Sequence, residues 1–207
     1  MMKKLQEYIF FSLILLLTSS VCVQAQPNVV IGPTSGSNSY FYGPYYRSST
    51  TSSYDYSRYA YLYTSSELNI PPGALITEVA WLKASGTITG NNVFNVWMEN
   101  TSATSLSSTA WSSLIATATP VYASTTQSFT AANDSYETFP LSSPFPYSGG
   151  ALEIITDHEM TGSPTAANDY YYEAVTGMAI GYASSTAAVV TTIIGSSSSY
   201  NDRRPTI

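Results

Sequence analysis

Residues 54–63 read YDYSRYAYLY, and this stretch decides the fold class. Aromatic residues alternate along it with small or polar ones, which is a period of two rather than the 3.6 of a helix. Tyrosine is also a favoured strand residue. The stretch therefore predicts a β-strand, and we expect Leu62 to contribute to the core.

Further extended segments follow along the chain and are separated by turn-forming residues such as Pro71-Pro72-Gly73. The expected strands span 54–63, 74–83, 93–99, 117–123, 136–141, 151–156, 169–176 and 187–194. Two short segments look helical, at 65–68 and 105–114. Many short strands with few helices predict an all-β fold, an antiparallel jelly-roll-like β-sandwich with one or two short helical turns. Its expected core consists of Leu62, Leu68, Val79, Trp81, Phe94, Val96, Met98, Trp111, Phe145, Leu152 and Ile154.

The N-terminal residues have the features of a secretory signal peptide. Lys3 and Lys4 precede an apolar block of about nine residues, which is too short for the roughly 20 that span a bilayer. Small residues follow, and we expect cleavage after Ala25. A lipoprotein signal is the alternative, because Cys22 lies near the cleavage zone. However, Val21 stands where a lipobox needs a small residue.

The expected organisation has three parts: a signal peptide at 1–25, a short N-terminal segment at 26–37 and a single β-sandwich module at 38–207. We expect a protein that is secreted or displayed on the cell surface, without membrane insertion after cleavage.

Composition excludes several classes of function. The net charge is −6 and basic residues are few, so no basic patch can bind a nucleic-acid backbone. Cys22 is the only cysteine, and the expected mature chain therefore has no disulfide and no thiolate site. His158 is the only histidine, which excludes zinc sites that need several histidines. No GxSxG motif accompanies it. Glu78 and Glu99 lie on predicted strands, but scattered acids give only a weak signal for a glycosidase pair. We expect no catalysis.

Several phrases resemble a known module. They are YSRYAYLYTSSEL at 56–68, ITEVAW at 76–81, FNVWMENTSATSLSSTAW at 94–111, PFPYSGGALEI at 144–154 and RPTI at 204–207. In this order they are similar to a β-sandwich module that recurs in secreted proteins of the Bacteroidetes type, often cargo of type IX secretion. The resemblance implies a jelly-roll-like sandwich within adhesin-like or other surface proteins. It implies architecture and location rather than a mechanism.

Acidic residues suggest one weak metal site. Asp157 and Glu159 follow a predicted strand, where loops gather at the rim of a sandwich, and Asp169 or Glu173 could join them around calcium. The acidic residues do not recur at the alternate positions of a calcium loop, so a solvated acidic turn is the preferred interpretation. We therefore expect no cofactor, with calcium as the alternative.

Arg58 predicts a structural polar clamp, because it is a rare basic residue inside an aromatic strand. Its guanidinium could stack on a neighbouring tyrosine and bind a carboxylate such as Glu67 or Glu153.

Aromatic residues indicate a candidate ligand-binding site. Trp97 lies opposite the core face of its strand and is expected to be the best exposed tryptophan, while Tyr42, Tyr45 and Tyr46 flank a Gly-Pro turn. Half-exposed strand packing is the competing interpretation. The preferred function is a non-catalytic interaction or structural module whose partners are other surface proteins or further copies of itself. The alternatives are a glycan-binding module for polysaccharide, which uses exposed aromatics, and a polymerising filament subunit, which uses strand edges.

Overall fold

Strands dominate the computed structural model, which describes residues 28–39, 42–45, 55–160, 167–185, 187, 189, 191–195 and 202–207. The strands in these ranges are β1 (Asn38–Ser39), β2 (Tyr56–Tyr63), β3 (Leu75–Ser85), β4 (Ile88–Thr101), β5 (Thr109–Ala110), β6 (Thr119–Phe129), β7 (Ser135–Pro146), β8 (Ala151–Met160), β9 (Asp169–Ala174), β10 (Ala179–Ser184), β11 (Ile193–Ile194) and β12 (Arg203–Pro205). The helices in the same ranges are α2 (Ser65–Leu68) and α3 (Trp111–Leu114). The predicted all-β, sandwich-like fold with short helical turns is confirmed.

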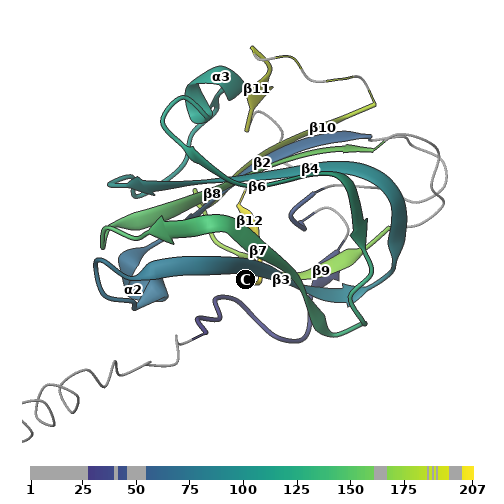
Figure 1. Cartoon of the computed structure of the whole chain (residues 1–207), viewed down its shortest axis with the longest axis horizontal. Helices are drawn as coiled ribbons and strands as arrows, with labels where there is room; N and C mark the ends of the chain where they lie inside the picture. Colours follow the sequence, from purple (N-terminus) through teal and green to yellow (C-terminus); the bar gives the residue numbers. More distant parts are fainter. Residues whose placement is uncertain are drawn as a thin grey trace, which may run out of the picture.

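Two antiparallel sheets form the two layers of the fold (Figure 1). Sheet I has the strand order β10-β2-β8-β4-β6, so that β8 lies at its centre. Sheet II has the order β1-β9-β3-β7, and β12 pairs with β9 beside this path. A separate two-stranded ribbon joins β5 and β11. Because the centre of sheet I is covered on both faces, β8 is almost wholly buried along its length.

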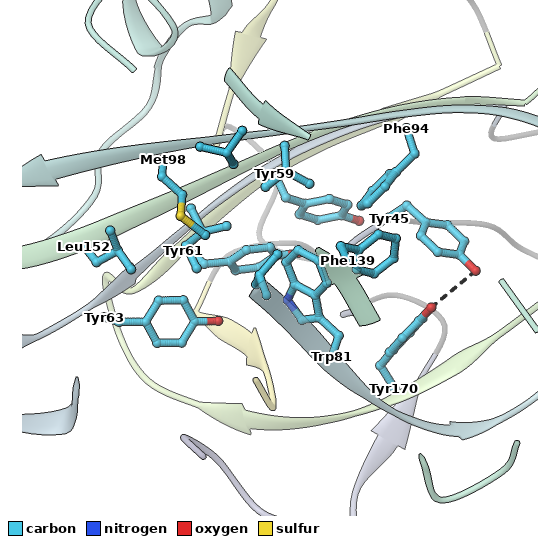
Figure 2. Close-up of a cluster of buried hydrophobic side chains, with 14 of the residues drawn as sticks. Tyr45, Tyr59, Tyr61, Tyr63, Trp81, Phe94, Met98, Phe139, Leu152 and Tyr170 are labelled. Carbon is cyan, nitrogen blue, oxygen red and sulfur yellow. Dashed lines mark hydrogen bonds between the residues drawn. The ribbon is translucent and has the colours of Figure 1, made fainter. Parts of the chain in front are cut away.

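The core fills the space between the two sheets (Figure 2). Phe94 of sheet I meets Trp81 and Phe139 of sheet II, with ring centroids 6.2 and 5.0 Å apart. Such aromatic pairs each add about 0.5–1.5 kcal/mol beyond the burial of apolar area. Every residue predicted for the core is buried. Tyr59 and Tyr61 stack in the same core with centroids 5.8 Å apart, although the sequence analysis did not assign them to it.

A third, small layer covers the outer face of sheet I. We call it the cap; it consists of β5, α3 and β11. In Figure 1, α3 and β11 lie above β2, β4 and β10. Trp111 and Leu114 of α3 and Ile194 of β11 pack there on Ala60 and Ile155 of the sheet. The cap gives sheet I a second hydrophobic cluster on the face that a simple sandwich would leave to solvent.

The helix α2 forms where its sequence predicts it, because its ends carry strong local signals. Thr64 Oγ1 accepts a hydrogen bond from the Glu67 amide, and a Glu67 carboxylate oxygen accepts one from the Thr64 amide. This reciprocal arrangement is a capping box. Asn69 ends the helix in the left-handed region, at φ 48°.

The described ends of the chain lie side by side against sheet II. Ile31 and Ile207 exchange two backbone hydrogen bonds of 2.9 and 3.0 Å, and the Leu82 amide of β3 donates to the Thr206 carbonyl at 3.0 Å. Ile31 belongs to the core between the sheets. The segment 28–31, which precedes the module boundary expected at residue 38, therefore packs with the module.

Some predicted elements differ from the structure. Within 105–114, only Trp111–Leu114 is helical, and within the described part of 187–194 only Ile193–Ile194 is a strand. The expected strands also do not include β1, β5, β10 and β12. β10 contains a glycine, and β12 is three residues long and ends in proline, so neither carries a clear period of two.

Candidate functional site

Charged side chains lie on the outer face of sheet I, in rows that strand register sets. Arg58 of β2 lies opposite Asp157 of β8, and Glu99 of β4 lies opposite Glu153 of β8. Residues 153, 155 and 157 of β8 share one face, since side chains alternate along a strand. The candidate site is this face, where Ile155 separates an ion pair from a pair of carboxyl groups.

The Arg58 side chain forms a polar clamp at one end of this row. Its Nε donates to Asp157 Oδ1 at 3.0 Å, and its Nη1 donates to the Val189 carbonyl at 2.9 Å. The guanidinium also lies over the Trp111 ring, 4.3 Å from the ring centre. Burial raises the pKa of Asp157, and Arg58 opposes this effect. Arg58 thus ties β2, β8 and the cap together.

The predicted partners of Arg58 are wrong in detail. Glu67 or Glu153 was the expected carboxylate partner of Arg58, but the structure places Asp157 there. Strand register is the reason, because Asp157 lies directly opposite Arg58. Glu153 is four residues away along β8, roughly 13 Å. The stacked aromatic ring is also Trp111 of the cap rather than a tyrosine of the same strand.

Glu67 belongs to a second ion cluster, around Arg204. The fully buried Arg204 donates from Nε to Glu173 at 3.0 Å and from Nη1 to Glu67 at 3.2 Å. Its guanidinium lies 4.5 Å from the centre of the Tyr63 ring. Hydrogen bonds from Arg204 hold the pKa of Glu67 at about 2. The cluster fastens β12 to α2 and β9, which is a structural role.

Within the part of the chain that the structure describes, Glu153 has no such counter-ion. Only 7% of it is exposed, and its Oε1 has no hydrogen-bond partner among the described residues. Its neighbour Glu99 is half-buried and accepts a hydrogen bond of 2.7 Å from Thr117 Oγ1. Burial, and then the charge of Glu99, raise the pKa of Glu153 to about 7. A buried carboxyl group that titrates near neutral pH is typical of functional sites and of strained polar positions.

Trp97 is the most exposed of the three tryptophans, as expected, but it is only partly exposed and does not form an open platform. It lies on the outer face of sheet I, as its alternation with Phe94, Val96 and Met98 predicts, but the cap covers it. Its ring packs edge-on against Trp111, with centroids 5.5 Å apart.

The tyrosines proposed for the same site have different environments. Tyr45 is 1% exposed and stacks on His158 in the core, with centroids 4.6 Å apart, so its assignment to a rim loop is wrong. Tyr42 is half-buried and packs on Tyr172 at 4.5 Å. Tyr46 lies outside the described residues. The structure therefore brings neither Tyr42 nor Tyr45 together with Trp97.

The segment Asp157–Glu159 is the end of β8 itself rather than a loop after it. His158 points into the core, where Nε2 lies 3.1 Å from Asn92 Oδ1. Asp157 is already paired with Arg58, so that it is not available to bind calcium together with Glu159, the second predicted ligand. Among the described residues, no group of three acidic, histidine or cysteine side chains is placed to bind a metal ion.

A groove opens where the two sheets separate, near α2 and the start of β3. It encloses about 660 Å³ and is lined by residues 28–31, 74–80 and Ile207 together with Tyr63, Met98 and Leu152 from the inner face of sheet I. Leu75 is 49% exposed at this groove, and Val30 is 51% exposed. Most lining side chains are apolar, and Glu78 is an acidic exception.

Sequence reasoning missed three charged groups that the structure buries. Lys83 is fully buried, donates to the Gly86 carbonyl at 2.8 Å and lies 4.0 Å from Glu137. Burial lowers the pKa of Lys83, and Glu137 opposes this effect. Arg204 and Glu137 are the other two. Along β3, Lys83 lies on the same face as Val79 and Trp81, and this alternation was the sequence signal for its burial.

Comparisons with known proteins identify no relative of this chain. No protein-family model, no curated protein and no solved structure matches this chain. Among the described residues there is also no helix with the length and apolar character that crossing a membrane requires.

Proposed function

We propose that this chain is an exported, non-catalytic β-sandwich module that binds another protein through the groove beside β3. The groove is the observation that carries the proposal, because it is apolar, open to solvent and has Leu75 and Val30 exposed within it. Exposed apolar patches on exported domains are typical of interaction sites. The signal-like N-terminus and the resemblance to surface modules support the location.

The roles of the other candidate residues agree with this proposal. The single histidine lies in the core, Arg58 and Arg204 bind carboxylates, and Trp97 packs beneath the cap. These side chains stabilise the fold, whereas the groove combines apolar surface with access. An extended peptide with alternating apolar residues fits such a groove best, because the apolar side chains on one side of the peptide can enter it while those on the other side stay in solvent.

A phage-displayed peptide library selected on the folded protein tests the proposal. We expect enrichment of peptides with alternating apolar residues, and we expect Leu75→Lys to weaken their binding at least tenfold. Ile193→Lys is the matched control, because Ile193 is also 49% exposed but lies on the cap. Selected peptides that bind both variants equally well, or no enrichment at all, would contradict the proposal.

The alternative functions predict other results. A glycan-binding module would retain polysaccharide in a manner that depends on Trp97. We expect a glycan array to give no hits that Trp97→Ala removes, since this side chain packs on Trp111. A filament subunit would instead form larger species as concentration rises, which sedimentation velocity measures.

A further inference from the structure

Two glutamates face each other on the outer face of sheet I, and neither forms an ion pair with a basic side chain of the described residues. Glu99 and Glu153 are direct cross-strand partners. Like charges at directly opposite positions destabilise a sheet. Burial makes this repulsion stronger, because charges interact more strongly away from water and Glu153 is only 7% exposed. A paired carboxylate at this position therefore calls for a physical explanation.

The described neighbours do not supply one. The pKa of Glu153 is raised by its burial and by Glu99, and no basic group among the described residues lowers it. Arg58 lies on the same face but is already bound to Asp157. Glu153 Oε1 has no hydrogen-bond partner among the described residues, and it is the unpartnered oxygen of a carboxyl group directed at the same face as Glu99.

The surrounding atoms offer oxygen ligands and a route from solvent. Glu99 is half-buried, and it accepts a hydrogen bond from Thr117 Oγ1, which lies in an exposed position between α3 and β6. Two carboxylates and a hydroxyl group are the hard oxygen donors that calcium prefers, and water can complete its coordination. Sites of this kind in extracellular modules bind calcium with dissociation constants of about 10⁻⁴–10⁻³ M.

We propose that Glu99 and Glu153 bind a calcium ion between β4 and β8. The ion neutralises the two carboxylates and binds the oxygen of Glu153 that is otherwise unpartnered. The site is separate from the acidic pair Asp157 and Glu159 that the sequence suggested, and it does not depend on the groove. Calcium then stabilises the face of sheet I on which the cap packs.

Unfolding in urea at pH 8 tests this proposal, first with EDTA and then with 10 mM calcium chloride. For a dissociation constant of about 1 mM, calcium should lower the unfolding equilibrium constant about tenfold. Glu153→Gln and Glu99→Gln should lose this effect, while Glu78→Gln, at an exposed position on β3, should keep it. Circular dichroism in EDTA verifies that each variant folds.

Terbium, which substitutes for calcium, gives a second measurement in the folded state. Trp97 is two residues before Glu99 and shares its face, so its excitation should sensitise terbium luminescence. We expect this luminescence in the wild type, its loss in Glu153→Gln and its decrease in Trp97→Phe. Equal calcium stabilisation of all variants, or none in the wild type, would overturn the proposal. If Glu153→Gln is stabilised in EDTA and calcium has no effect on the wild type, the two carboxyl groups share a proton instead.

Discussion

Replacing Glu153 with glutamine should make the protein more stable at alkaline pH and have little effect at acidic pH. Burial and Glu99 raise the pKa of Glu153 from 4.5 to about 7 in the folded chain. The folded state therefore binds a proton more tightly than the unfolded state. The carboxyl group costs nothing while both states are protonated, and its cost grows as the pH rises from about 4.5 to 7.

The size of the effect follows from these two values. The difference between about 7 and 4.5 is 2.5 pH units. At about 1.36 kcal/mol per unit, the wild type should lose about 3 kcal/mol of unfolding free energy between pH 4 and pH 8 through this group. Glutamine has a similar shape but does not ionise. The stability difference between Glu153→Gln and the wild type should therefore grow by about 3 kcal/mol over the same interval.

Urea unfolding followed by tryptophan fluorescence, at one-unit steps from pH 4 to pH 8 in EDTA, measures this difference. EDTA removes divalent cations, so that protonation alone is observed. Glu78→Gln is the control, because this exposed glutamate should change the unfolding free energy by less than about 0.5 kcal/mol at every pH. A difference between Glu153→Gln and the wild type that does not vary with pH would refute the assigned environment of Glu153.

Three further predictions concern the fold and the mature chain. Arg204→Met should lower the free energy of unfolding by about 3–5 kcal/mol in urea, because it leaves two carboxylates without their buried partner. Arg203→Met, at a partly exposed neighbour, should lower it by less than about 1 kcal/mol. Equal losses in the two variants would contradict the role of the Arg204 cluster. Phe94→Ala should cost about 3–5 kcal/mol, the usual loss for a buried aromatic, and an unchanged melting midpoint would contradict its place in the core. Mass spectrometry of exported protein should find Gln26 at the N-terminus, and a lipid-modified Cys22 there would show the alternative processing.

The core was predictable because it follows from the alternation within each strand. In β4, Phe94, Val96 and Met98 are buried and Asn95 and Trp97 face the other side, as a period of two requires. The same rule predicted Val79 and Trp81 in β3. The helix α2 was also predictable, since its capping box is formed entirely within residues 64–67.

The ion clusters and the candidate site were less predictable because each of their contacts joins elements that are far apart in the chain. Arg58 and Asp157 are 99 residues apart in the chain, and Arg204 and Glu67 are 137 apart. The sequence shows that a rare arginine needs a carboxylate, but strand order and register decide which one it meets. Glu99 and Glu153 form a pair for the same reason, because β4 and β8 are not consecutive in the chain but are adjacent in sheet I.

The cap had the largest effect on the functional predictions. Alternation correctly placed Trp97 on the outer face of its strand, and a two-layer sandwich would have left that face to solvent. Trp111 lies in the four-residue helix α3, which follows β4 in the chain. It covers this face together with Ile194 of β11, which lies near the C-terminal part of the chain. No local pattern contains that contact.

By itself, the sequence determined the fold class, many residues of the core and the short helix α2, because periodicity and capping act between near neighbours in the chain. Only the tertiary structure decided which carboxylate binds each arginine, which glutamate faces a second carboxyl group and which aromatic side chains remain accessible. These outcomes depend on strand order, register and a third layer, which are set by contacts between residues far apart in sequence.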